Sequence, residues 1–166
     1  MDILWAPWRM KYVRYEALKR EEGCFLCRAA RAEKLEEQLV LYRGRDGLVV
    51  MNKYPYNTGH LLVAPLRHVP SLEDLEEEEL CKLFSLVKRC LKLLRAALNP
   101  DGFNIGVNLG RVAGAGLEDH VHVHIVPRWN GDTNFMPIIA DTKVIPEALK
   151  DTYRALMKHA DLLKET

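Results

Sequence analysis

The sequence predicts a mixed α+β domain built on an antiparallel sheet. Along the chain, short strand-like runs come first, followed by one long stretch with apolar residues at helical spacing and then by further strands. This order is typical of an α+β domain. A chain of 166 residues, 48% hydrophobic and 28% charged, is long enough to bury the core of one ordinary domain. We therefore expect five strands and one long helix.

The first three strands follow an aromatic, basic N-terminal arm over residues 1–21. A short helix is expected next, directly after a cysteine pair. Apolar runs over 39–44 and 47–52 predict a strand pair, because turn residues with glycine at both ends separate them. A third strand over 60–65 ends at its proline.

The long helix is expected over residues 71–98. Ser71 followed by acidic residues is typical of a helix start, and leucines repeat at helical spacing until an Asn-Pro pair ends the pattern. Cys81 and Cys90 lie within this helix. Because free cysteine is most often a buried apolar side chain, we expect both of them to be packing residues.

The fourth and fifth strands are expected over 103–110 and 119–129, with a glycine-rich loop between them. The chain is therefore read as one domain, with a core over 22–137 and a C-terminal extension over 138–166. The extension is expected to hold an amphipathic helix.

The charge pattern excludes several classes of protein. The formal net charge is +1, with basic and acidic residues interspersed, whereas a nucleic-acid surface would show a clustered basic excess. We find neither a signal-peptide pattern nor an apolar run of membrane-spanning length. These features predict a cytoplasmic protein, and its cysteines would then be reduced.

Three of the six histidines stand at alternate positions, in the stretch "DHVHVHIVPRW". In a strand, His120, His122 and His124 would leave from one face while the apolar spacers enter the core. Three adjacent imidazoles would repel one another if all were protonated. Ligands, catalytic groups or both are therefore expected here.

A second cluster of candidate ligands begins with Cys24 and Cys27 in C-x-x-C spacing. This spacing suits two thiolates on one tetrahedral metal ion, and a redox pair is the alternative. A structural zinc site needs two more ligands, for which His68 and His120 are available. His68 could equally be a turn histidine, whereas His60 opens a strand after a loop, where functional groups are common.

Taken together, these motifs resemble one family. "HVHVHIV" resembles the histidine-triad motif of the HIT family of nucleotide hydrolases and transferases, and "NKYPYNTGHLLVAPLRHV" resembles its first-histidine strand. "WAPWRMKY", "GFNIGVNLGRVAGAG" and "VPRWNGDTNFMP" are similar to the bacterial branch that includes diadenosine tetraphosphate phosphorylases. The resemblance covers residues 4 to 145, and it implies the HIT-like fold, an adenine nucleotide substrate and a homodimer.

The resemblance assigns roles to both histidine groups. It makes His122 the nucleophile that forms a nucleotidyl-histidine intermediate, with His60 and His124 as supporting catalytic groups. It also implies a structural zinc site, whose ligands would be Cys24, Cys27, His68 and His120.

The same resemblance predicts the nucleotide-binding residues. Asn52 would contact the ribose hydroxyls where the family has an acidic residue, and Asn108 would contact phosphate. The glycine-rich loop allows close backbone approach to phosphate oxygens. Two apolar residues between the cysteines lie where the family builds its base slot, with plain core residues as the alternative reading. The full set is Asn52, Asn108, Gly114, Gly116, Phe25 and Leu26.

Two departures from the family pattern bear on the chemistry. Gly116, Leu117 and Glu118 stand where many members have Gln, Ser or Thr, which removes a side chain near the leaving group. Val123 stands where the phosphorylase branch often has a polar residue, which favours water over phosphate as the acceptor. The branch motifs favour phosphate, and Arg128 is the candidate donor that would hold it.

The leading function is therefore cleavage of diadenosine polyphosphates at an α-phosphate, with phosphorolysis narrowly favoured. An adenosine phosphoramidase, or AMP-releasing hydrolase, is an alternative within the family. A zinc-stabilised nucleotide-binding module with little turnover is a third reading. A catalytic metal on all three triad histidines is disfavoured, because a metal-bound His122 could not attack phosphorus.

Overall fold

A computed structural model of the chain describes residues 23–113, 119–133 and 145–164. Its centre is a five-stranded sheet in the order β1-β2-β3-β5-β4, in which every neighbouring pair is antiparallel. The predicted α+β architecture, with five strands and one long helix, is confirmed. The N-terminal arm over 1–21 lies outside the described residues, as do Gly114 and Gly116.

Strands β1 (Val40–Gly44) and β2 (Gly47–Met51) form the predicted hairpin. Strand β3 (Leu61–Ala64) pairs with the other edge of β2. Every residue of β2 is buried, because both faces of the sheet are covered at this point. Its alternate side chains enter two separate apolar clusters, as the two-residue period of a strand requires.

Strand β5 (Val123–Arg128) lies between β3 and the edge strand β4 (Gly102–Val107). The predicted histidine strand began at 119, but only its last histidine lies in the ladder. Val121 instead donates its backbone N–H to the carbonyl of Val69, 2.7 Å away, so the segment before β5 is held by the loop after β3. This contact keeps the first two triad histidines outside the sheet.

The long helix α3 spans Glu77–Leu98, and its N-terminus differs from the prediction. Ser71 precedes only a 3-10 turn (Leu72–Asp74) and makes no side-chain capping bond. Leu75 is extended, which separates that turn from α3. The capping box is formed instead by Glu76 and Glu79, each accepting a backbone N–H of the other.

Cys90 is buried as expected, but Cys81 is exposed, so the prediction that it is a packing residue is wrong. The two cysteines are about two and a half helical turns apart, which places them on opposite sides of α3. The leucines that pack against the sheet share the side of Cys90. Identity as cysteine therefore predicted burial less well than position on the helix did.

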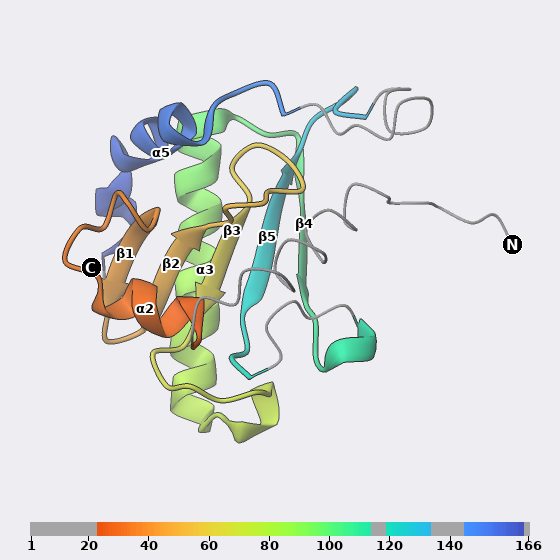
Figure 1. The fold of residues 1–166 in the computed structure, drawn as a ribbon. Helices are drawn as coiled ribbons and strands as arrows, with labels where there is room; N and C mark the ends of the chain where they lie inside the picture. The colour runs from red at the N-terminus through yellow and green to blue at the C-terminus, as the bar shows by residue number, and fades with distance from the viewer. Residues whose placement is uncertain (1–22, 114–118, 134–144, 165–166) are drawn as a thin grey trace, which may run out of the picture.

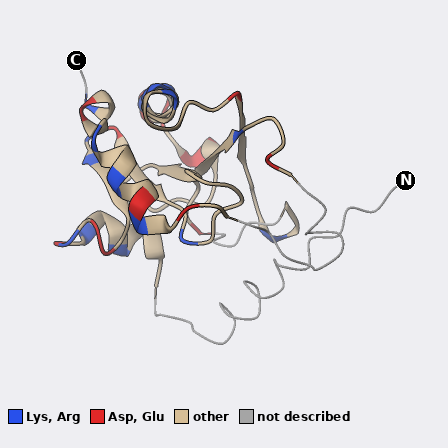
Figure 2. Ribbon diagram, turned by 90° about the horizontal axis from the view of Figure 1, so that it is seen from above, with Lys and Arg blue, Asp and Glu red and all other residues tan. Residues whose placement is uncertain are grey.

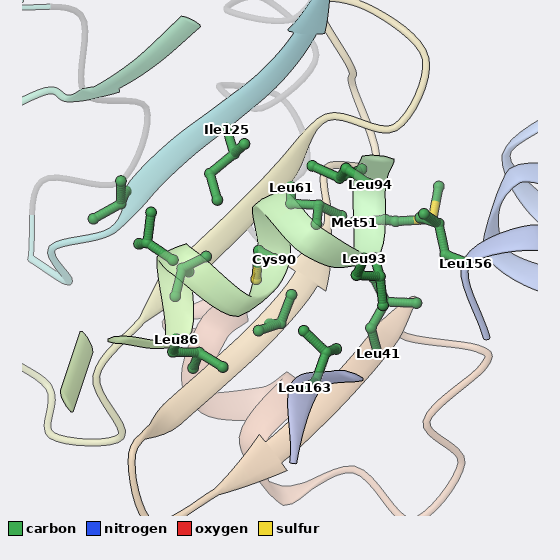
Figure 3. Packing of buried hydrophobic residues seen from close by; sticks show 14 of the residues in the cluster. Leu41, Met51, Leu61, Leu86, Cys90, Leu93, Leu94, Ile125, Leu156 and Leu163 are labelled. Atoms are coloured by element: carbon green, nitrogen blue, oxygen red, sulfur yellow. The ribbon is translucent and has the colours of Figure 1, made fainter. Parts of the chain in front are cut away.

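The helices cover the two faces of the sheet in separate layers (Figure 1). Helix α3 covers one face, and the short helix α2 (Phe25–Arg31) packs on the other face against β1 and β2. Helix α5 (Leu149–Met157) and the following 3-10 turn (Ala160–Leu163) pack beside α3. The expected helix of the C-terminal extension is confirmed, and Leu156 and Leu163 lie within the main core (Figure 3).

The described surface carries both signs of charge. Lys and Arg segments alternate with Asp and Glu segments along the ribbon (Figure 2). Within the described ranges, no helix has the length and apolar character that crossing a membrane would require.

Candidate active site

Four candidate metal ligands that are far apart in the sequence come together beside α2. The Nδ1 atom of His68 lies 3.3 Å from Cys27 Sγ. The Nδ1 atom of His120 lies 3.2 Å from Cys24 Sγ and 3.5 Å from Cys27 Sγ. The ligand atoms of all four residues lie within 4.8 Å of one another. The structure therefore assembles the predicted set.

Local structure explains how this cluster forms. Cys24 is the N-cap of α2, where its Sγ accepts the backbone N–H of Cys27 at 3.4 Å. The first turn of the helix thus places both sulfurs on one side. His68 comes from the loop after β3 and His120 from the segment before β5, so the cluster ties three parts of the chain together.

The ring of His120 is oriented by a backbone oxygen. Its Nε2–H donates to the carbonyl of Pro65 over 2.9 Å, and a carbonyl can only accept. The lone pair therefore remains on Nδ1, which faces the sulfurs. Burial is the main cause that lowers the pKa of His120, and burial likewise raises the pKa of the Cys24 thiol.

His60 is fully buried, and its tautomer is fixed by its neighbours. Its Nδ1 accepts the backbone N–H of Tyr56 at 3.1 Å, so this nitrogen carries the lone pair. The proton is therefore on Nε2, which donates to Nδ1 of His124 over 3.0 Å. Burial first, and then the nearby imidazoles of His124 and His122, lower the pKa of His60 to about 3.

His122 has the opposite tautomer. Its Nδ1–H donates to the carbonyl of His120 over 2.8 Å, which leaves the lone pair on Nε2. Burial lowers the pKa of His122, and the hydrogen bond to His120 offsets part of this effect. Because the ring is only 6% exposed, the imidazole stays neutral and keeps a basic nitrogen at neutral pH.

The rings of His122 and His124 lie side by side with complementary nitrogens at Nε2. Their ring centroids lie 4.8 Å apart. His124 accepts a hydrogen bond at Nδ1, so its own proton is on Nε2, while His122 has a lone pair at the same atom. One imidazole can therefore attack an electrophile while its neighbour donates a hydrogen bond to the departing group.

The predicted nucleotide-binding residues are only partly grouped around this pair. Asn108 directly follows β4, and extending the pairing of Val107 with Val123 by one residue brings it level with His122. Asn52 contacts Nδ1 of His60 through its Nδ2 at 3.3 Å. Phe25 is half-buried in α2, whereas Leu26 has no exposed surface and packs in the smaller core cluster.

Arg128, the candidate phosphate donor, is engaged elsewhere. Its guanidinium makes two bonds to the Asp132 carboxylate, of 2.6 and 2.8 Å, and a third to Asn104 of 2.8 Å. Asp132 raises the pKa of Arg128, as expected for a bidentate ion pair. A second phosphate would have to compete with this carboxylate, so the structure gives Arg128 a structural role.

Sequence reasoning missed Tyr56 and Pro65. Both fix histidine tautomers through backbone atoms, and any residue type can supply such an atom, so neither has a sequence signature. The Tyr56 ring also lies beside His60, with centroids 4.7 Å apart. For Tyr56, the sequence offered one signal, which is an aromatic residue four positions before the candidate histidine His60.

Comparison with known proteins agrees with this geometry. The model of the HIT domain matches residues 33–131. A Mycobacterium tuberculosis protein named AP-4-A phosphorylase is 43% identical over 161 residues, covering 94% of this chain and 83% of that protein.

Two solved structures are similar in fold. One is a hypothetical histidine triad nucleotide-binding protein from Sulfolobus tokodaii, with a TM-score of 0.67, 30% identity, and coverage of 84% of this chain and 91% of that one. The other is a Zn-bound histidine triad family protein from Mycobacterium smegmatis, with a TM-score of 0.67, 25% identity, and coverage of 84% and 94%.

We expect acid to destabilise the protein partly through His60. Its pKa is about 3 in the folded protein, against about 6.5 in an unfolded chain. Between these values the unfolded state binds more protons, so the free energy of unfolding falls as pH falls through this window. Urea unfolding at about pH 7 and about pH 4.5 measures the loss. The His60→Gln variant should lose less, and an equal loss in both proteins would contradict the assignment.

Proposed function

This chain belongs to the HIT family, and on that premise we propose that it is an enzyme that cleaves diadenosine polyphosphates at an α-phosphate. The observation that carries the proposal is the His122 imidazole, with Nδ1 committed to a carbonyl and the lone pair left on Nε2. The name of the M. tuberculosis relative, AP-4-A phosphorylase, supports the substrate class.

In the first step, the Nε2 lone pair of His122 attacks the α-phosphorus, and the bond from phosphorus to the bridging oxygen breaks. The polyphosphate departs as an anion whose oxygen accepts a hydrogen bond from Nε2–H of His124, and His60 holds the His124 ring in place through their hydrogen bond. The intermediate is nucleotidyl-His122. Water, which loses a proton to solvent, or a phosphate oxygen anion then attacks this phosphorus as its bond to Nε2 breaks, and His122 leaves with its electron pair restored.

The predicted nucleotide contacts fit this reaction as proposals. Asn108 would face phosphate beside His122, and Asn52 and Phe25 would contact the ribose and the base. Gly114 and Gly116 would approach the phosphate oxygens through backbone N–H groups. Leu26 would support the base slot from beneath, since its side chain is fully buried.

A catalytic metal on the three triad histidines is not supported by the geometry. Nδ1 of His120 faces two sulfurs, and Nδ1 of His122 is bonded to a carbonyl. The triad is therefore divided between two uses, with one histidine in the cysteine cluster and two in the catalytic pair.

The products should identify both substrate class and acceptor. With diadenosine tetraphosphate and inorganic phosphate, we expect ADP plus ATP, because the nucleotidyl group is transferred to phosphate. AMP plus ATP at every phosphate level would mean that water is the acceptor, and the engagement of Arg128 by Asp132 makes this the main alternative. Cleavage of adenosine phosphoramidate alone would support the phosphoramidase instead.

We expect His122→Ala and His122→Gly to abolish covalent labelling by radiolabelled substrate and to lower turnover at least ~10³-fold. His60→Ala and His124→Ala should cost about 10- to 10³-fold, because they remove supporting groups only. His159→Ala, between α5 and the last 3-10 turn, is the matched control. Near-full activity of His122→Ala would exclude the mechanism, and binding without labelling of the native protein would indicate a nucleotide-binding module.

We also propose that Cys24, Cys27, His68 and His120 hold a structural zinc ion. Tetrahedral zinc, with Zn–S of about 2.3 Å and Zn–N of about 2.0–2.1 Å, places sulfur and nitrogen about 3.5 Å apart. The Sγ to Nδ1 distances of 3.2, 3.3 and 3.5 Å fit this requirement. When bound, zinc would supply a cross-link between α2 and the loops before α3 and β5.

Metal analysis of the purified chain should find about one zinc per chain, and chelation should lower the melting temperature more than it impairs chemistry in the folded fraction. Cys24→Ser and Cys27→Ser should lose the metal, whereas Cys81→Ser should retain it because Cys81 is exposed on α3. A zinc-free protein with a Cys24–Cys27 disulfide would overturn the assignment.

The homodimer implied by the family remains a proposal, for which we assign the edge strand β4 as the interface. Ile105 is 46% exposed on this strand. An unpaired strand edge with an exposed apolar side chain favours pairing with a second chain.

We expect a solution mass of two chains, reduced to one by Ile105→Lys. Phe84→Lys, on α3, is the matched control because Phe84 is 45% exposed. A monomeric native protein would contradict the proposal.

We further propose that the whole chain is one domain. Leu156 and Leu163 lie beyond the region matched to the HIT domain, yet they are fully buried in the same cluster as Ile125. Tyr153 adds a hydrogen bond of 2.9 Å from its hydroxyl to the carbonyl of Val40. The C-terminal extension thus completes the core.

A further inference from the structure

The side chain of Asn52 is placed to determine which nitrogen of His60 carries the proton, in addition to the ribose contact predicted for it. Its Nδ2 lies 3.3 Å from Nδ1 of His60. The backbone N–H of Tyr56 donates to the same nitrogen at 3.1 Å. Two N–H donors therefore converge on one imidazole nitrogen, which keeps a proton off that atom.

The orientation of the Asn52 amide is itself fixed. Its Oδ1 accepts the backbone N–H of Tyr54 at 2.9 Å. A backbone N–H cannot accept a hydrogen bond, so the oxygen must face Tyr54 and the NH₂ group must face His60. A carboxylate at this position would keep the bond to Tyr54 but would present an acceptor to His60, reversing the preference of Nδ1.

The direction of the histidine chain depends on this preference. With Nδ1 of His60 an acceptor, its proton lies on Nε2 and points to Nδ1 of His124. The titratable groups acting on His60 are His122 and His124 of the triad segment. The side chain of Asn52 and the backbone N–H of Tyr56, both before β3 in the sequence, contact Nδ1 of His60.

Building on the proposed function, we propose that Asn52 is a positioning residue, which keeps the proton of His60 on Nε2 so that His124 presents its own Nε2–H to the leaving oxygen. Because the amide has two N–H bonds, this role is compatible with a ribose contact. The two roles make different predictions, so they can be separated.

The tautomer of His60 tests the proposal without turnover. In ¹⁵N NMR spectra of the full-length, zinc-loaded protein at neutral pH, His60 is identified by the signals that His60→Gln removes. We expect a neutral ring with the proton on Nε2. Asn52→Asp should put a proton on Nδ1 and make the ring cationic, because the carboxylate replaces a donor by an acceptor and outweighs the single Tyr56 N–H. Tyr56→Phe should change neither, because both donors to Nδ1 remain.

A native His60 protonated on Nδ1 would overturn the proposal, and so would an Asn52→Asp variant with an unchanged ring. If these spectra agree with expectation but no substrate is turned over, the proposed function fails while the tautomer assignment stands. The spectra therefore distinguish the two failures.

Kinetics then separate positioning from ribose binding. Asn52→Leu should lower kcat about 10-fold, because the acid is less well oriented. We expect the same factor on an adenylate ester lacking both ribose hydroxyls, since the affected proton lies at the leaving group. A loss seen only with the ribose substrate, and only in KM, would mean that Asn52 merely contacts the sugar.

Discussion

The hydrogen bond from Nδ1 of His122 to the carbonyl of His120, 2.8 Å long, joins the two halves of the site. His120 contributes its ring to the cysteine cluster and its carbonyl to the tautomer of His122. Two histidines separated by one residue can therefore have different roles, because only His120 turns its ring toward the cysteine cluster. Any disturbance of the cluster that moves the backbone of His120 would also release the ring of His122, because the His120 carbonyl is the acceptor that holds this ring.

The sheet separates this polar site from the core. Val123 and Ile125 of β5 enter the cluster under α3, so His124, between them, faces the opposite side. His60, one residue before β3, faces the same side as His124, and its Nε2 lies 3.0 Å from Nδ1 of His124. The face carrying α3 supplies apolar burial, and the other face is left for histidines whose low pKa values follow from their own burial.

Three predictions about single side chains differ from the structure. Cys81 was expected in the core because cysteine is often buried, but its position on α3 turns it outward. Ser71 was expected to cap the helix, but Glu76 and Glu79 form the box. Arg128 was expected to bind phosphate, but its guanidinium pairs with the carboxylate of Asp132. The side of the helix decided the first case, and a nearby charged residue decided the other two. Spacing in the sequence did not reveal those partners.

The sequence by itself predicted five strands, a single long helix, and two histidines available to join the C-x-x-C pair in a metal site. These follow from periodicity and motif spacing, which are local properties of the chain, whereas the role of His122 as nucleophile was implied by the resemblance to the HIT family. Only the tertiary structure decided which nitrogen of each imidazole carries the proton. That choice depends mainly on backbone atoms of Tyr56, Pro65 and His120, joined at His60 by the amide we assign to Asn52. A backbone N–H or carbonyl has the same chemistry in nearly every residue type, so folding alone reveals its position.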